Sequence, residues 1–304
     1  MVDLRNFEAW LVQQNRSRYT VRGYLADCRE FFLWFTSNPL TVTRENLDAY
    51  LQVLREKPGR NGQKMSPKSI NKKVNGIAAY FRFLLYKGSN KTNPVDGLRR
   101  PESKRSLPKI IPLADVRAML NAPAVGYAQR VDRLIVNLFF STGARLGDLE
   151  QARLVDYNPT EGTLHTVGKG GKEAYMMIGD GAKALLDAYL LERKSPLPNL
   201  LVKEDGTLWP RNQIYLAVKR LAKRAGVTKS VHPHAFRHTA ATELYKNSHD
   251  IKMVQEFLRH SSSATTDIYT HVSTDQLKAA HHKFHPDNFA PKEMDKSDPD
   301  GGKA

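Results

Sequence analysis

The sequence has a single cysteine, Cys28, among 304 residues. A lone thiol cannot form an intramolecular disulfide or a cysteine-based zinc site. No apolar run approaches the ~18 residues that a transmembrane helix needs. The start, MVDLRNFEAW, lacks the basic and then apolar layout of a signal peptide. These absences fit a soluble protein of a reducing cytoplasm.

Acidic residues are also scarce relative to basic ones. The formal net charge is +16 and the sequence pI is about 9.8. Residues 1–110 hold 21 Lys and Arg against 9 Asp and Glu, whereas the rest of the chain holds 26 against 22. Such an excess predicts a polyanionic partner, with nucleic acid first. The alternatives are a basic protein that is merely soluble, or a membrane-surface protein, which the absence of a lipidation signal disfavours.

Residues 1–96 show apolar side chains at helical spacing, and short polar loops separate the segments. We expect four helices in a compact bundle, with N-caps at Thr20, at Thr43 and at Ser66 or Ser69. The polar faces carry many basic residues. Most such charges are simply solvated, but their excess in one small bundle favours contacts with DNA phosphates. The candidate DNA-binding residues are Arg16, Arg18, Arg22, Lys68, Lys72 and Lys73.

Residues 97–112, GLRRPESKRSLPKIIP, are basic, contain three prolines and show no periodicity, so we interpret them as a linker. Residues 113–290 form the second predicted domain. Residues 291–304 have almost no apolar content and are expected to be disordered.

The second domain is predicted to be mainly helical with a small β-sheet, so the fold class is mainly α with an α+β second domain. Two short strands, 163–167 and 174–178, flank the glycine-rich hairpin VGKGGKE. The expected helices cover residues 113–122, 128–140, 146–152, 181–193, 211–225, 235–246, 250–259, 264–269 and about 274–283.

Five segments of this domain hold residues suited to phosphodiester chemistry: STGARLGDLE (141–150), VGKGGKE (167–173), HPHAFRHTAA (232–241), FLRHSS (257–262) and TTDIYTHV (265–272). Breaking a phosphodiester without a metal gathers negative charge on the non-bridging oxygens. Two guanidinium groups hold such charge bidentately, and Arg145 and Arg237 are the candidates. Tyr269 is the candidate for a covalent nucleophile.

Proton transfer needs further groups. The unperturbed pKa of a tyrosine is about 10, so a base or cationic surroundings must assist Tyr269. His234 and His260 are available for this. The leaving 5′ oxygen needs a proton, which Lys169 on the hairpin can supply. The sequence has no GxxxxGK[ST] loop, which agrees with rejoining that uses no nucleotide.

Each residue also has an ordinary structural interpretation. Arg145 alone resembles a surface charge, His234 an N-cap or core histidine, and Tyr269 a core aromatic residue. Lys172 competes with Lys169 for any reactive role. Only the order and spacing of these residues together point to phosphodiester chemistry.

That order resembles the tyrosine recombinase family, the phage-type integrases that include the Xer-type resolvases. The family's motifs are matched by TGAR with Asp148 (142–148), by GKGGKE with Lys169 (168–173), and by HAFRH (234–238). A later histidine, His260, and a Y-x-H segment beginning at Tyr269 complete the pattern. The likeness covers about residues 3–286, because the helical bundle also resembles the family's core-binding domain. Two departures are Arg259, where the family usually has glycine, and Asp148, where glutamate is commoner.

The resemblance implies a site-specific DNA recombinase that closes as a C-shaped clamp on double-stranded DNA. It further implies a homotetramer on two duplexes, a Holliday junction, and DNA integration, excision or resolution. In this scheme Arg145 and Arg237 hold the scissile phosphate and His260 adds a hydrogen bond. His234 handles the tyrosine proton, and Tyr269 ends as a 3′-phosphotyrosine.

The same resemblance implies that the reaction needs no metal or other cofactor. It also implies a cytoplasmic, nucleoid-associated location and allows for an accessory factor. Asp148 is expected to accept hydrogen bonds in the surroundings of an active-site arginine and so to support it. Leu277, Ala280 and Phe284 mark one apolar stripe of a short terminal helix. The family analogy favours exchange of this helix between protomers, and the alternative is packing on its own domain. A non-cleaving regulator of the same fold and a type IB topoisomerase-like enzyme remain as alternatives.

Overall fold

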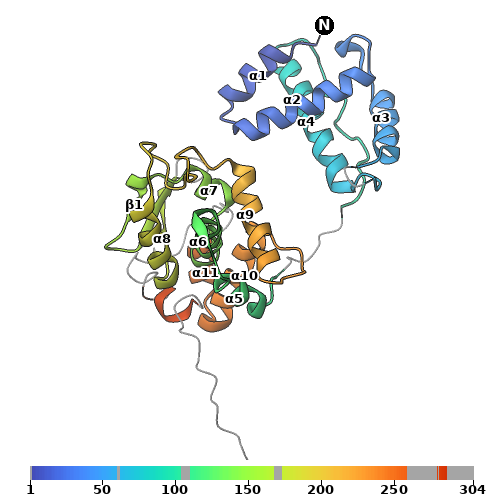
Figure 1. The fold of residues 1–304 in the computed structure, drawn as a ribbon. Coiled ribbons are helices and arrows are strands. Elements are labelled where there is room, and N and C mark those ends of the chain that lie inside the picture. Colours follow the sequence, from blue (N-terminus) through green and yellow to red (C-terminus); the bar gives the residue numbers. More distant parts are fainter. Residues whose placement is uncertain are drawn as a thin grey trace, which may run out of the picture. The chain divides into compact units, whose positions relative to one another are not determined.

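The computed structural model describes residues 2–59, 62–103, 110–167, 173–258, 279 and 281–285. The chain divides into two compact units, residues 1–106 and 107–304 (Figure 1). The division falls inside the segment 97–112, which we expect to be a linker. Within the described residues, no helix is long and apolar enough to cross a bilayer.

Unit 1 consists of α-helices around an aromatic core. Its elements are α1 (Leu4–Gln13), α2 (Arg18–Trp34), the short 3₁₀ helix η1 (Pro39–Thr41), α3 (Arg44–Glu56) and α4 (Pro67–Tyr86). The rings of Phe7, Phe31 and Tyr80 are buried in its centre. Phe7 meets Tyr80 edge-on, with ring centroids 5.3 Å apart, so α1 and α4 are joined through aromatic contacts.

The N-caps of unit 1 explain where its helices begin. Ser17, and not Thr20 as expected, caps α2: the Ser17 hydroxyl accepts the backbone N–H of Thr20 at 3.2 Å. Thr43 caps α3 as predicted. Of the two serines left open, Ser66 caps α4 by accepting the N–H of Ser69 at 3.2 Å. A cap hydroxyl satisfies an N–H that has no partner within the helix, which fixes the start of each helix.

Unit 2 is helical with one small antiparallel sheet. Its elements are α5 (Leu113–Leu120), α6 (Gly126–Thr142), α7 (Leu146–Gln151), η2 (Leu154–Asp156), β1 (Tyr157–Asn158), β2 (Thr163–Val167), β3 (Glu173–Met177), α8 (Asp180–Glu192), α9 (Arg211–Arg224), α10 (Pro233–Ser248) and α11 (Ile251–Leu258). The sheet order is β1-β2-β3, and Leu164 pairs with Met176. The predicted fold class is confirmed.

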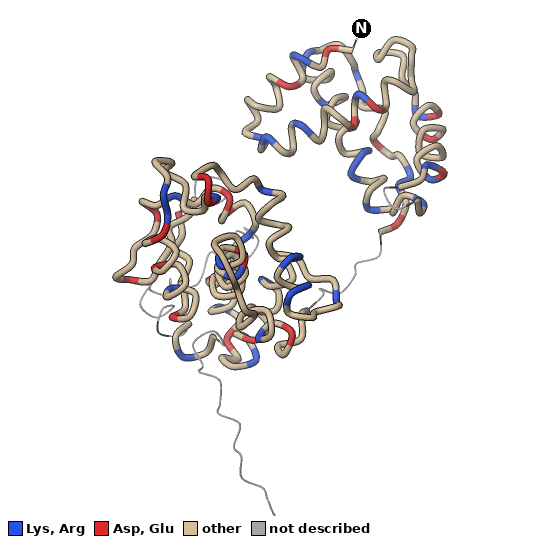
Figure 2. Tube along the Cα trace, viewed as in Figure 1, with Lys and Arg blue, Asp and Glu red and all other residues tan. Residues whose placement is uncertain are grey.

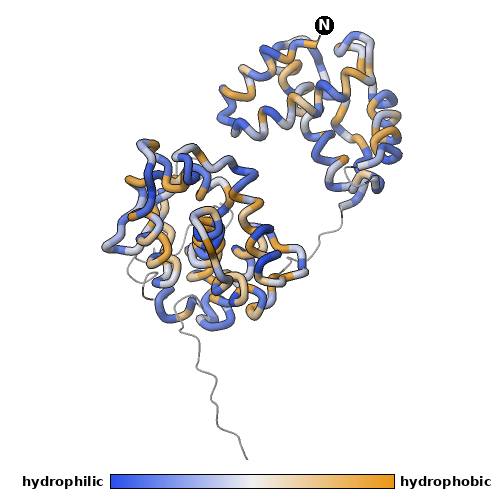
Figure 3. Tube along the Cα trace, in the orientation of Figure 1, coloured by the Kyte–Doolittle hydropathy of each residue, from blue (hydrophilic) through white to orange (hydrophobic). Residues whose placement is uncertain are grey.

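Helix α6 is the centre of unit 2. It packs against α5, α8, α9 and α10, and it lies in the middle of this unit in Figure 1. Its C-terminal half is buried on all sides, including the polar residues Ser141 and Thr142. In Figure 3, hydrophobic segments alternate with hydrophilic ones on α6 and on the helices around it. The end of α6 is therefore a rigid point from which a site can be built.

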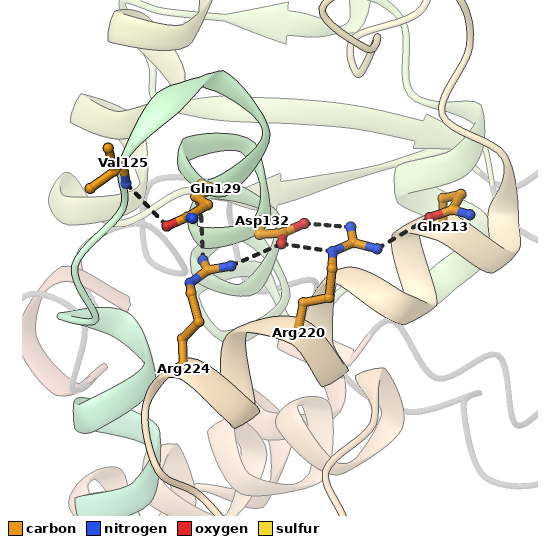
Figure 4. Close-up of polar contacts among 6 residues, drawn as sticks. All are labelled: Val125, Gln129, Asp132, Gln213, Arg220 and Arg224. Atoms are coloured by element: carbon orange, nitrogen blue, oxygen red, sulfur yellow. Dashed lines mark hydrogen bonds and ion pairs between the residues drawn. The ribbon is translucent and has the colours of Figure 1, made fainter.

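A buried carboxylate fastens α9 to α6 (Figure 4). Asp132 is 2 % exposed and accepts two hydrogen bonds from Arg220, at 2.6 and 2.9 Å. Arg224, one turn further along α9, donates to the same carboxylate at 3.2 Å. A buried carboxylate is tolerated where charge-assisted hydrogen bonds replace its hydration, and here two guanidinium groups supply them.

Most predicted elements of unit 2 agree with the structure to within about two residues. The exceptions are β1 and η2, which were not predicted, because elements of two or three residues carry no periodic pattern. The expected helix 264–269 and tail 291–304 lie outside the described residues, as does most of the expected helix 274–283.

Candidate active site

The predicted catalytic residues begin at a tight turn after α6. Gly143 follows the last residue of α6 in the left-handed conformation, with φ of 59°. A Cβ at this position would lie 2.7 Å from a ring atom of Phe257, so glycine is required both for the backbone conformation and for the space. The turn sends the chain directly into α7, whose N-cap residue is Arg145.

Asp148 supports this turn. Its Oδ2 accepts the backbone N–H of Arg145 at 2.9 Å. This contact is with the main chain of Arg145, and the expected support of an active-site arginine by the Asp148 side chain stays a prediction. Holding the main chain fixes the direction in which the Arg145 side chain leaves α7, and a shorter aspartate is sufficient for that.

The second arginine lies on α10. His232 caps this helix, since its Nδ1 accepts the N–H of Ala235 at 3.1 Å, and Pro233 occupies the first helical position. Arg237 is 4 % exposed. Its guanidinium donates to the carbonyl of Gly143 and to the carbonyl of Leu258, at the end of α11. Three segments that are distant in sequence therefore meet at this one side chain.

His234 is the third predicted residue that the structure brings to this point. It lies on the exposed side of the first turn of α10. Partial desolvation lowers its pKa, and the charges of His232, His238, Arg237 and Arg145 lower it further. The imidazole is therefore kept in the neutral form, which accepts a proton. Because both arginines act on His234, the three predicted residues share one electrostatic neighbourhood.

The segment 281–285 closes the other side of the Gly143 turn. His281 and His285 are 3 % and 0 % exposed. Phe284 packs on the core of unit 2, and Asn247 of α10 donates to its carbonyl at 2.9 Å. In this structure the described part of the terminal segment thus packs on its own chain. Leu277 and Ala280 lie outside the described residues.

The remaining predicted catalytic residues, Lys169, His260 and Tyr269, lie outside the described residues, as do Lys172 and Arg259. Lys169 follows β2 and precedes β3, and His260 comes two residues after Leu258, whose carbonyl accepts from Arg237. Among the described side chains, no group of three or more His, Cys, Asp and Glu is arranged to hold a metal ion.

The DNA-binding candidates of unit 1 differ in how free their charges are. Lys and Arg occur on all four of its α-helices (Figure 2). Lys73 is largely buried and ion-paired with Glu30, and it lies 3.8 Å from Asp27. Arg18 donates to the hydroxyl of Tyr19 at 2.9 Å. The other candidates are exposed; they are Arg16, Arg22, Lys68 and Lys72.

Sequence reasoning did not single out Phe257, His281 or His285. Phe257 is one apolar residue among many in the sequence. The two histidines are four residues apart, which places them on one face of a helix. That spacing was the only available signal, and it does not reveal that the face is buried.

Comparison with known proteins identifies relatives of this chain. Residues 109–276 match the phage integrase family. The chain is 28% identical to a tyrosine recombinase XerD from Listeria innocua, covering 91% of this chain and 95% of the relative. It is 30% identical to a tyrosine recombinase XerC from Oceanobacillus iheyensis, covering 90% and 92%.

Solved structures show the same fold. XerH site-specific recombinase bound to its difH substrate matches with a TM-score of 0.63 and 21% identity, covering 88% of this chain and 80% of that one. A lambda integrase dimer bound to a COC′ core site matches with a TM-score of 0.64 and 18% identity, covering 89% and 97%. Because the family match spans more than half of the sequence, and the XerC relative is 30% identical over nine tenths of it, the chain belongs to the phage integrase family.

Proposed function

We propose that this enzyme cleaves and rejoins duplex DNA at a specific site through a covalent bond between Tyr269 and a DNA 3′-phosphate. Relatives named as tyrosine recombinases cover nine tenths of the chain and support this reaction. The observation that carries the proposal is that Arg237 donates to the carbonyl of Gly143, two residues before Arg145, and that the charges of both arginines lower the pKa of His234. Two guanidinium groups beside a neutral imidazole suit a phosphate that is attacked by a hydroxyl group.

In the proposed step, the Tyr269 oxygen attacks phosphorus in line with the bond to the 5′ oxygen. The bond from phosphorus to Tyr269 forms while the bond to the 5′ oxygen breaks. His234 takes the tyrosine proton, and Lys169 gives a proton to the departing 5′ oxygen. The phosphotyrosine keeps the energy of the original ester, so the reverse attack by a 5′-hydroxyl rejoins the strand.

The two arginines hold the charge that develops on the non-bridging oxygens. The carbonyls of Gly143 and Leu258 orient Arg237, and the Asp148 contact orients the main chain of Arg145. His260 is proposed to add a hydrogen bond to the same phosphate. Because Leu258 both precedes His260 and accepts from Arg237, the two groups are well suited to act on one phosphate.

For the assembly, we propose a homotetramer on two duplexes that passes through a Holliday junction and exchanges its terminal helix between protomers. A lambda integrase tetramer bound to a Holliday junction has the same fold, with a TM-score of 0.62. In the exchanged assembly, the segment 281–285 of a neighbouring protomer, with that protomer's His281 and His285, would occupy the place that the segment takes on its own unit in this structure. We further propose that unit 1 binds DNA through its exposed basic residues and that the protein associates with the nucleoid.

The proposed role of Arg145 can be tested with Arg145→Ala. Binding sites are first selected by the protein from a random DNA library, and each site is then rebuilt as a duplex with a nick that traps the covalent adduct. We expect DNA binding to persist and adduct formation to slow by about 100-fold or more, since a phosphate-stabilising group is lost. Arg153→Ala is the matched control, because Arg153 is exposed and its nearest acidic partner is Asp156 at 3.8 Å. Adduct formation at the parental rate in Arg145→Ala would refute the role given to this arginine.

A further inference from the structure

Two buried histidines hold the segment 281–285 on unit 2. Their rings stack with centroids 4.4 Å apart and planes 9° from parallel. The ring of Phe140, on α6, lies 5.0 Å from that of His285, and the ring of Phe257, on α11, lies 5.7 Å from it. The pair thus fills an apolar groove between the end of α6 and α11.

Polar contacts of the pair are directed at the main chain of α6. The Nε2 atom of His281 lies 2.7 Å from the carbonyl of Ser141 and must donate to it, because a carbonyl only accepts. The Ser141 hydroxyl accepts the N–H of Gly179 at 2.6 Å, which ties the same residue to the start of α8. His285 makes a backbone hydrogen bond with Phe140. The histidines therefore hold Phe140 and Ser141, the two residues directly before Thr142 and Gly143.

The groove is continuous with the contacts that orient Arg237. Phe257 packs against His281, with ring centroids 5.9 Å apart, and against the Cα of Gly143 so closely that no Cβ fits. The Gly143 carbonyl accepts from Arg237, and so does that of Leu258, the residue after Phe257. Loss of the histidine pair would leave one side of Phe257 without packing, and the two carbonyls would lose their support.

We propose that His281 and His285 are positioning residues: as neutral imidazoles they dock the segment 281–285 against Phe257 and so hold the two carbonyls that orient Arg237. The proposal extends the proposed function, because it adds a control on one catalytic arginine. It also makes the docking sensitive to acid. Two stacked rings in an apolar groove cannot both carry charge, and a protonated ring would have to leave the groove for water.

Among the described residues, the charged groups around the pair bring opposing effects. Asp180 at the start of α8 favours protonation of His281, but it pairs with the exposed His282 at 3.4 Å, and His282 opposes it. Glu161 and Lys183 line the hollow beside His281 and bring opposite charges. The contacts from α6 and α11 are aromatic rings and backbone groups. Burial consequently lowers the pKa of His281 to about 4 and that of His285 well below its ordinary value.

The direction of the pH effect follows from these pKa values. The undocked segment has histidines near the ordinary pKa of 6.5, whereas docked His281 has a pKa of about 4. Between these values the undocked form binds more protons, so docking is fully favourable above pH 6.5 and weakens as the pH falls. Lowering the pH from 8 to 5 should weaken docking by more than about tenfold through His281 alone.

Hydrogen exchange of the full-length protein, corrected for the intrinsic pH dependence, measures docking directly. We expect protection of residues 281–285 and of the turn after α6 to fall together between pH 8 and pH 5. In the double variant His281→Gln, His285→Gln, the amide can donate as the ring does but cannot titrate. Its protection should therefore not fall with pH. His282→Gln is the matched control and should keep the acid sensitivity, because His282 is exposed.

Cleavage of a trapping substrate over the same pH range tests the link to Arg237. Cleavage by the parent should fall at acid pH with the loss of protection, and the double Gln variant should lose less. His281→Leu, which cannot donate to Ser141, should cleave at least about tenfold more slowly at every pH. Equal protection of the parent at pH 5 and pH 8, or acid sensitivity in the double variant equal to that of the parent, would overturn the proposal. If the parent never cleaves DNA, the proposed function fails while the exchange experiment still decides the docking.

Discussion

At the scale of single residues, Gly143 is the position on which the described part of the site depends. Its positive φ ends α6 and begins the turn to Arg145. Its carbonyl orients Arg237, and the ring of Phe257 packs against its Cα, which carries no side chain. One residue thus determines the geometry of both arginines, although it has no side chain to react.

Gly143→Ala should therefore reduce stability and cleavage together. A left-handed alanine alone costs about 1–2 kcal/mol, and the Cβ would also displace Phe257. Gly226→Ala is the control for the backbone cost, because Gly226 has φ of 69° in the same unit and a Cβ there meets nothing within 4 Å. We expect chemical unfolding to give a loss of about 1 kcal/mol for Gly226→Ala and about 3 kcal/mol for Gly143→Ala. Equal losses of unfolding free energy in the two variants would mean that the contact between Gly143 and Phe257 does not contribute to stability.

Residue order predicted the site residues but not how they are held. Of those residues the structure describes Arg145, His234 and Arg237: Arg237 donates to the carbonyl of Gly143, two residues before Arg145, and the charges of both arginines lower the pKa of His234. The cap of α2 was wrong because Ser17 and Thr20 are both good cap residues three positions apart, and their hydroxyls lie 3.0 Å from each other. The burial of His281 and His285 could not be predicted, because it comes from packing against residues about 140 positions away.

At the scale of elements, the attachment of α9 to α6 depends on Asp132. Arg220 and Arg224 are one turn apart on α9, and both donate to this carboxylate (Figure 4). Arg220 also lies over the ring of Trp209, 5.6 Å from its centroid. The sequence predicted a helix over residues 211–225 but gave no sign of this network, because an acidic residue within a helix is most often solvated.

Asp132→Ala should destabilise unit 2 by about 2–3 kcal/mol, because two guanidinium groups lose a shared acceptor. The arginines are partly exposed and can turn to water, which keeps the cost below that of a fully buried pair. Asp132→Asn retains one acceptor oxygen and should lose about half as much stability. Thermal unfolding of the two variants measures the difference, and parental stability in Asp132→Ala would contradict the role assigned to the network.

At the scale of the whole molecule, the excess of basic residues and the predicted catalytic residues lie in different parts of the chain. The basic excess lies in residues 1–110, and the predicted chemistry lies in the segment that matches the phage integrase family. Composition alone could predict a polyanionic partner. It could not tell which cations of unit 1 are available, because ion pairing such as that of Lys73 depends on the packing of α2 against α4.

This division predicts different outcomes for two lysines of α4. Lys68→Ala should weaken DNA binding by about three- to tenfold, because an exposed contact with a phosphate is lost. For the same reason, the slope of log Kd against the logarithm of the salt concentration should fall by about one. Lys73→Ala should leave the salt dependence nearly unchanged and lower the stability of unit 1 by about 1–2 kcal/mol, since Glu30 keeps only Lys57 as an ion-pair partner and Asp27 loses a neighbouring cation. Binding titrations at several salt concentrations, together with unfolding curves, separate the two effects. A Lys73→Ala variant that loses salt dependence like Lys68→Ala would show that Lys73 contacts DNA.

The proposed covalent bond between Tyr269 and DNA can be measured directly. The most direct measurement is to trap the adduct on a nicked duplex that carries a selected site, digest the protein, and identify the modified peptide by mass spectrometry. The account predicts a nucleotide attached to Tyr269 through a 3′-phosphate in the parent and no adduct with Tyr269→Phe, although that variant still binds the duplex. An adduct that persists in Tyr269→Phe, or a nucleotide attached to any other residue, would contradict it.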